Sequence, residues 1–260
     1  MAIVGESSPF RKLPQALARR QVLFLDGIRY CAEMAELSHV RLRSTAAAIT
    51  QASANGQQLN GPFYAAAFMD AWAIIDSTHR MRELVRQLPG LSKKKHSVEW
   101  RTFESSTAVV KDFRNKVQHL DQEINKVVEQ DQPVWGMLTW FAALDENPAT
   151  IMHCWLGAGT VFPMEAPAFT VGEPKELEPP VDHIKLHAHG LTLSLTDILK
   201  AIERMFKELE RAFGEAFDRM PSGTETSGSD IFMSVGMGRG ENQPPQESET
   251  PDAEDGAELG

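Results

Sequence analysis

The fold of this chain is decided by the stretch FRNKVQHLDQEI, residues 113–124. Within this stretch and on both sides of it, apolar residues recur at steps of three and four, the spacing that places side chains on one face of a helix. We expect that face to be buried in a helical bundle. Its members are Phe103, Val110, Phe113, Val117, Leu120, Ile124 and Val127.

A polar cluster lies on the other side of the same predicted helix. At about 100° of rotation per residue, Asn115 and His119 fall one turn apart on nearly the opposite face. Arg114 falls at the edge of the apolar face. The cluster should therefore point away from the core of its own bundle.

Arg114, Asn115 and His119 together read R-N-x-x-x-H, which resembles the signature of the HEPN superfamily. The resemblance covers about residues 60–130. It implies a helical bundle, a dimer with a shared cleft, and RNA cleavage without metal to 2′,3′-cyclic phosphate products. Catalytically inactive HEPN-like domains serve protein or nucleotide binding, so a non-enzymatic interaction module is the alternative.

These residue types suit RNA cleavage. The reaction needs a base for the 2′-hydroxyl, an acid for the 5′ leaving oxygen and a cation for the charge at phosphorus. Histidine titrates near neutral pH and the guanidinium of arginine keeps a charge that matches phosphate oxygens, so His119 and Arg114 supply the right types of group. Asn115 would orient the imidazole or bind substrate. One histidine cannot easily make both proton transfers, a difficulty that eases if two subunits bring their motif helices together.

The preceding helix carries a second polar stripe. Asp76 can accept a hydrogen bond from His79 or Arg80 on its own helix, although ordinary surface pairs have the same spacing. We interpret these residues as neighbours of the cleft. The expected substrate-binding residues are Asp76, His79, Arg80, Lys111 and Lys116.

The formal net charge of −10 is unevenly distributed. Residues 221–260 hold nine acidic side chains and one basic side chain, so the first 220 residues carry only −2. The span from His79 to Lys116 holds ten Lys or Arg against four acids. Such a span could attract phosphates or could be a solvated charged face. The acidic tail could also fold back over the basic span as a phosphate mimic.

The chain in order predicts an α+β protein. Helical patterns run over residues 15–54, with Gly27 as a possible bend, over 62–88, and from the N-cap Ser97 to about residue 130. Residues 134–141 and 150–156 predict a β-hairpin, and 184–195 alternate like strands before a helix capped by Thr196-Asp197. The fold class is thus a mainly α-helical, up-and-down, HEPN-like bundle, then a small antiparallel sheet and a closing helix.

Four segments follow from these patterns. We expect residues 1–14 to be flexible, 15–130 to form the bundle, and 131–220 to add the strands and the last helix packed on it. Residues 221–260 are too polar to repay chain entropy by burial, so we expect a disordered acidic tail.

Several function classes lack support. The sequence contains no Walker loop, GxSxG or HExxH motif, and we expect no cofactor. Two cysteines, Cys31 and Cys154, are too few for a disulfide framework and suit a reducing cytoplasm. The first 14 residues lack an apolar signal region, and no window approaches the ~20 apolar residues of a membrane span.

A group of histidines is the remaining candidate for a metal site. His187 and His189 would share one strand face, and His183 with Asp182 lies nearby, as does His153 beside Cys154. Histidine alternating with Leu or Ala is typical of a half-exposed strand, so we expect no metal. The leading hypothesis is a cytoplasmic, metal-independent endoribonuclease of toxin or defence type. Its partners would be RNA, a second copy in a homodimer, and a protein partner or antitoxin.

Overall fold

The structure is a computed structural model, and it describes residues 2–57, 59, 61–89, 97–129, 133–143, 151–157, 159, 176–219, 226, 230 and 233–234. The chain divides into two units, Met1–Ser229 and Asp230–Gly260, and the described helices and strands all belong to the first unit. The predicted disorder of 221–260 falls almost wholly outside the described residues.

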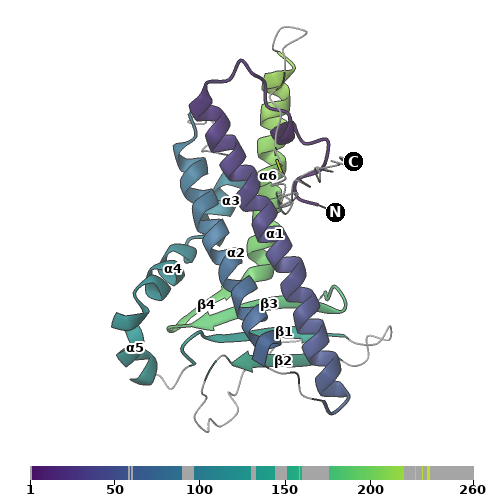
Figure 1. Cartoon of the computed structure of the whole chain (residues 1–260), viewed down its shortest axis with the longest axis vertical. Coiled ribbons are helices and arrows are strands. Elements are labelled where there is room, and N and C mark those ends of the chain that lie inside the picture. The colour runs from purple at the N-terminus through teal and green to yellow at the C-terminus, as the bar shows by residue number, and fades with distance from the viewer. Residues whose placement is uncertain are drawn as a thin grey trace, which may run out of the picture. The chain divides into compact units, whose positions relative to one another are not determined.

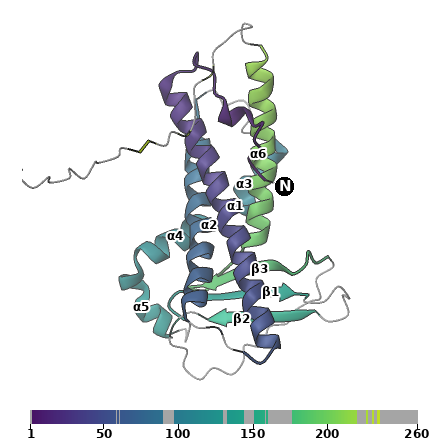
Figure 2. The same cartoon turned by 45° about the vertical axis from the view of Figure 1, so that its right-hand side comes forward.

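Three long helices lie side by side in the first unit, α1 (Arg19–Ala54), α2 (Gly61–Gln87) and α6 (Leu195–Phe217) (Figures 1 and 2). Their contacts are made by small and branched side chains, among them Ala32 and Ala35 of α1 and Ala71 and Ile74 of α2, all buried. Small side chains let helix backbones approach closely. The first two predicted helices are confirmed, although α1 begins four residues later than expected.

Gly27 marks a close approach between α1 and α2. A Cβ at this position would lie 2.9 Å from Cδ1 of Leu84 on α2. A side chain at this position would have to displace the flexible end of the Leu84 side chain.

The third predicted helix is wrong as a single element. It forms three short helices, α3 (Val98–Ser106), α4 (Val110–Gln118) and α5 (Leu120–Glu129). Arg82 of α2 supplies the reason for the first break, because its Nη1 donates to the carbonyl of Thr107. His119 makes the second break, with φ −115° and ψ 36°. The predicted N-cap is confirmed, since Oγ of Ser97 accepts from the backbone N–H of Trp100.

These breaks change which part of the apolar face is buried. Phe103, Val110 and Phe113 are fully buried and Val127 is nearly so, as predicted. Ile124 is 40% exposed, and Val117 is only half-buried. The prediction of one continuous buried face is therefore correct for α3 and the start of α4, whereas beyond it the face is buried at Val127 but not at Val117 or Ile124.

The sheet has the order β2-β1-β3-β4 and is antiparallel throughout. Its strands are β1 (Met137–Ala142), β2 (Met152–Gly157), β3 (Val181–Ala188) and β4 (Leu191–Ser194), which confirms the predicted hairpin. It lies across the end of the bundle where α1 ends and α2 begins (Figures 1 and 2). Trp140 attaches it there, because its Nε1 donates to Oγ1 of Thr50 on α1 over 2.9 Å.

The closing helix α6 is confirmed, with a cap two residues earlier than predicted. Oγ of Ser194 accepts from the N–H of Asp197, while Oγ1 of Thr196 accepts from the N–H of Ile184 on β3. Phe206 of α6 packs against Phe10, with ring centroids 4.8 Å apart. The N-terminal residues expected to be flexible thus include buried side chains, namely Ile3, Val4, Phe10 and Leu13.

None of the helices in the described residues combines the length and the apolar content that crossing a membrane requires.

Candidate functional site

An ion pair between two helices lies at the centre of the site. Nε of Arg114, on α4, donates to Oδ1 of Asp76, on α2, over 3.2 Å. The other oxygen of Asp76, Oδ2, accepts from Nε of Arg80 over 2.7 Å, which confirms the predicted contact between Asp76 and Arg80. One carboxylate therefore holds two guanidinium groups.

The Arg114 side chain keeps part of its hydrogen-bonding capacity. It is 29% exposed, and within the described part of the chain neither of its Nη groups has a partner. A guanidinium held through Nε presents its two Nη groups as a fork that fits two oxygens of a phosphate. Asp76 thus orients Arg114 without occupying the edge that would bind an anion.

His79 belongs to the same cluster. It follows Asp76 by three residues on α2 and is half-buried. Burial lowers the pKa of His79 below its ordinary value, and the positive charge of Arg114 lowers it further. A neutral imidazole, which can accept a proton, is therefore the favoured form at neutral pH.

His119 lies apart from this cluster. It is exposed and ends α4, and its backbone N–H donates to the carbonyl of Asn115 over 3.2 Å. Five residues of helix turn the two side chains about 140° apart and separate them by about 7.5 Å along the axis. Within the described residues, the His119 side chain has no hydrogen bond with Arg114 or Asn115. The structure therefore brings Asp76, Arg80 and Arg114 together, but not Arg114 and His119 of one chain.

The two predicted lysine contacts differ in their surroundings. Nζ of Lys116 donates to the carbonyl of His189 over 2.8 Å, which fastens α4 to the turn between β3 and β4. Lys111 is exposed, and it has no ion-pair or hydrogen-bond partner among the described residues. Lys111 is thus placed to meet a ligand, whereas Lys116 already has a structural contact.

Part of the basic span is neutralised inside the fold. Arg82 is 7% exposed, and its Nη2 pairs with Glu104 of α3 over 2.9 Å. Nη2 of Arg86 contacts the same carboxylate over 2.6 Å. Burial by itself would raise the pKa of Glu104, but hydrogen bonds from Arg86 and Arg82 bring it below its ordinary value. These two arginines hold α2 and α3 together, and Lys93, Lys94 and Lys95 lie outside the described residues.

A cavity of about 710 Å³ lies beside the ion pair, and we call it the aromatic cavity. Trp72 in its wall lies one turn before Asp76 on α2, and Val117 in its wall lies three residues after Arg114 on α4. The cavity was not among the features predicted from the sequence. The spacing of Tyr64, Phe68 and Trp72, four residues apart, was the available signal. The cavity is lined by Gly61, Tyr64, Ala65, Phe68, Met69, Trp72, Val117, Trp135, Gly157 and Gly159.

The histidine group has structural contacts. The two ring nitrogens of His187 lie 2.9 Å from Oγ1 of Thr139 and 2.9 Å from Oγ1 of Thr192. His189 does not share its strand face, as the sequence had suggested, because it lies in the turn after β3 with φ 54°. In the described ranges, no three His, Cys, Asp or Glu side chains are grouped so that they could hold a metal ion.

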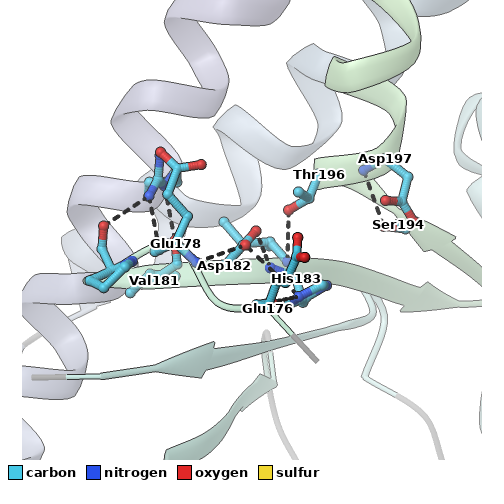
Figure 3. A network of polar contacts seen from close by, with 11 residues as sticks. Glu176, Glu178, Val181, Asp182, His183, Ser194, Thr196 and Asp197 are labelled. Carbon is cyan, nitrogen blue, oxygen red and sulfur yellow. Dashed lines mark hydrogen bonds and ion pairs between the residues drawn. The ribbon is translucent and has the colours of Figure 1, made fainter. Parts of the chain in front are cut away.

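A network of polar contacts connects the segment before β3 with the first residues of β3 and with α1 (Figure 3). Asp182 accepts from the backbone N–H of Glu178 over 3.1 Å and of His183 over 2.6 Å. Nε2 of His183 lies 2.8 Å from the carbonyl of Glu176. Arg43 of α1 donates to the carbonyl of Val181 and pairs with Glu178. These contacts fix the start of β3 against α1.

Comparison of the chain with protein-family models, with curated proteins and with solved structures finds no match.

Proposed function

We propose that this protein is a metal-independent endoribonuclease that cleaves RNA to 2′,3′-cyclic phosphate products. The observation that supports it best is the Arg114 guanidinium, which Asp76 holds through Nε while its Nη groups have no partner in the described residues. Such a group suits the charge that develops on a phosphate during cleavage. The R-N-x-x-x-H resemblance at Arg114 to His119 points to the same chemistry.

The proposed roles follow from the residue types. Arg114 binds the scissile phosphate. A neutral histidine removes the proton of the 2′-hydroxyl, whose oxygen attacks phosphorus, and a protonated histidine gives a proton to the departing 5′ oxygen. His79 and His119 are the two histidines of the site, and the low pKa of His79 suits it to the role of base.

A dimer completes the proposed site. Because Arg114 and His119 diverge on α4, His119 of one protomer would act with Arg114 and His79 of its partner. The resemblance implies the same shared cleft. We also propose that the helical part is a HEPN-like bundle, that the protein acts in a toxin or defence system, and that it is located in the cytoplasm.

Cleavage assays with matched variants test the proposal. Purified protein is incubated with single-stranded RNA and with transfer RNA in the presence of a chelator. We expect wild type to release 2′,3′-cyclic phosphate ends, and His119→Ala and Arg114→Ala to lose at least about a hundredfold in rate, as removal of one proton-transfer or charge-stabilising group does. Arg101→Ala, which removes an exposed arginine of α3, serves as the control. RNA decay at the wild-type rate in His119→Ala would remove the proposal.

A second candidate, a non-catalytic module that binds a protein partner, has one observation in its favour. Large apolar side chains are exposed along one side of α1: Leu23 at 62%, Tyr30 at 45%, Met34 at 43% and Leu37 at 58%. Apolar surface of this kind often marks an interaction site. Light scattering that shows a monomer, together with no RNA affinity, would favour this module over the nuclease.

A further inference from the structure

The aromatic cavity has the wall chemistry of a stacking site. Tyr64, Phe68 and Trp72 line it from α2, and Trp135 lines it from the segment before β1. The indole of Trp135 is 43% exposed, so it stands at the rim rather than in the core. Proteins that bind single-stranded nucleic acid stack bases on side chains of this kind, whatever the base.

Its size and glycine content suit a flat ligand. The volume of about 710 Å³ falls within the range of about 300–1,000 Å³ typical of small-molecule sites. Gly61, Gly157 and Gly159 form the parts of the wall that lack a side chain. A planar ring can therefore enter between the aromatic side chains and these backbone surfaces.

Charge beside the cavity narrows the class of ligand. Trp72 and Asp76 are four residues apart on α2, and Val117 and Arg114 are three residues apart on α4. At a rise of about 1.5 Å per residue, roughly 4.5 to 6 Å along each helix axis separates the apolar wall from the ion pair. This separation is of the same order as that between a nucleobase and its own phosphate. Arg114 also retains its Nη groups for an anion. An aromatic ring joined to a phosphate matches both features, whereas a purely apolar ligand uses only one.

We propose that the aromatic cavity is a subsite for an unpaired nucleobase, whose phosphate binds Arg114. This inference rests on the proposed function in that it names the substrate class of the same site as single-stranded RNA. A base must leave a duplex to enter the cavity, so paired RNA is a poor substrate. Trp135 and Trp72 stack on the base, and neither takes part in proton transfer.

Calorimetric titration of the full-length His119→Ala protein tests the subsite without turnover. The ligands are AMP, CMP and ribose 5-phosphate, which keeps the sugar and phosphate but lacks the base. We expect both nucleotides to bind at least about tenfold more tightly than ribose 5-phosphate, as loss of base stacking implies. Equal affinity for AMP and ribose 5-phosphate would overturn the inference.

Two variants assign the binding to the cavity. In the same background, Trp135→Ala should weaken AMP binding about tenfold or more. Trp155→Ala, which removes an indole that is 50% exposed on β2 outside the cavity, should leave it unchanged. Met69→Glu adds a negative charge at a wall residue that is 56% exposed and should also weaken AMP binding. Equal AMP affinity in Trp135→Ala, Met69→Glu and Trp155→Ala would contradict the inference.

The outcomes separate this inference from the nuclease. Base-dependent binding of AMP by a protein that leaves RNA intact would support the nucleobase subsite and contradict the proposed nuclease activity. The opposite result is RNA cleavage that depends on His119, an unchanged KM for RNA in Trp135→Ala, and no binding of AMP. It would support the nuclease activity and contradict the nucleobase subsite. Binding of decanoate without binding of AMP would make the cavity a lipid site and overturn the inference.

Discussion

Nε of Arg114 and Oδ1 of Asp76 lie 3.2 Å apart, and this contact joins α4 to α2 beside the aromatic cavity. The side chains are 29% and 42% exposed, so their attraction is screened by solvent. Exposed ion pairs contribute about 0–1 kcal/mol to folding. The contact therefore matters more for the direction of the guanidinium than for the stability of the fold.

Replacement of Asp76 tests this separation of roles. In Asp76→Ala, Arg114 and Arg80 both lose their carboxylate, so we expect RNA cleavage to fall about tenfold or more because the phosphate-binding group is no longer positioned. The free energy of unfolding in urea should change by about 1 kcal/mol or less. Glu83→Gln on the same helix, where Glu83 is 43% exposed and pairs with Arg86, is the matched control. Full activity in Asp76→Ala would show that the ion pair does not position Arg114.

The lysines of α4 should differ in their effect on RNA binding. Each phosphate contact to single-stranded RNA contributes about −0.7 to the slope of log K against log salt. We expect Arg114→Ala and Lys111→Ala to reduce that slope by about this amount each. Lys116→Met should leave the slope unchanged, because its Nζ contacts the carbonyl of His189. Filter binding of an uncleavable RNA at several salt concentrations measures the three slopes. A reduced slope in Lys116→Met would show that Lys116 contacts the RNA, as the sequence had suggested.

Glu104 should be a stability residue and not a catalytic one. It pairs with the buried Arg82 and with Arg86, and its own side chain is 21% exposed. Removing one partner of a buried ion pair costs about 3–5 kcal/mol, and the partial exposure here should reduce the loss in Glu104→Gln to about 2–3 kcal/mol. Urea unfolding measures it. Glu210→Gln, on α6, is the control, and an equal effect of both substitutions would contradict the assignment.

His39 should make the protein sensitive to acid. It is 6% exposed, and burial, followed by the charge of Arg43, lowers its pKa from 6.5 to about 4. Below pH 6.5, His39 is therefore protonated in the unfolded chain, whereas in the folded chain it is protonated only below about pH 4. Stability from this group is complete above pH 6.5 and is lost as the pH falls towards 4, by up to roughly 3 kcal/mol.

Urea unfolding of wild type and His39→Leu at pH 7 and pH 4.5 checks this dependence. Leucine does not titrate, so the variant should lose less stability between the two pH values than wild type does. Equal losses in both proteins would show that His39 does not cause the acid sensitivity.

Local patterns in the sequence predict most of the elements, and contacts between distant residues account for the differences. The hydrogen bond between Asp76 and Arg80 follows from a spacing of four residues on one helix. The bond between Asp76 and Arg114 joins residues 38 positions apart, and only the packing of α4 on α2 creates it. The spacing of apolar residues on both sides of Thr107 favoured a continuous helix. In the structure, Arg82 donates a hydrogen bond to the carbonyl of Thr107, and α3 ends there.

The candidate site shows the same division. The motif helix and the stripe containing Asp76 were recognised because each depends on one helical period. The aromatic cavity was missed because its wall combines four separate parts of the chain, represented by Trp72, Val117, Trp135 and Gly157. The expected strand position of His189 failed because His189 and Gly190 both have positive φ and form the two-residue turn between β3 and β4.

A subunit-mixing assay tests the central claim most directly. Arg114→Ala and His119→Ala proteins are each inactive under the proposal, and they are unfolded together and refolded as a mixture. With random pairing, half of the dimers are mixed and each has one intact site of two, so we predict recovery of about a quarter of the wild-type RNA cleavage. A mixture that stays as inactive as its components, while wild type cleaves, would contradict a site that takes Arg114 from one protomer and His119 from the other.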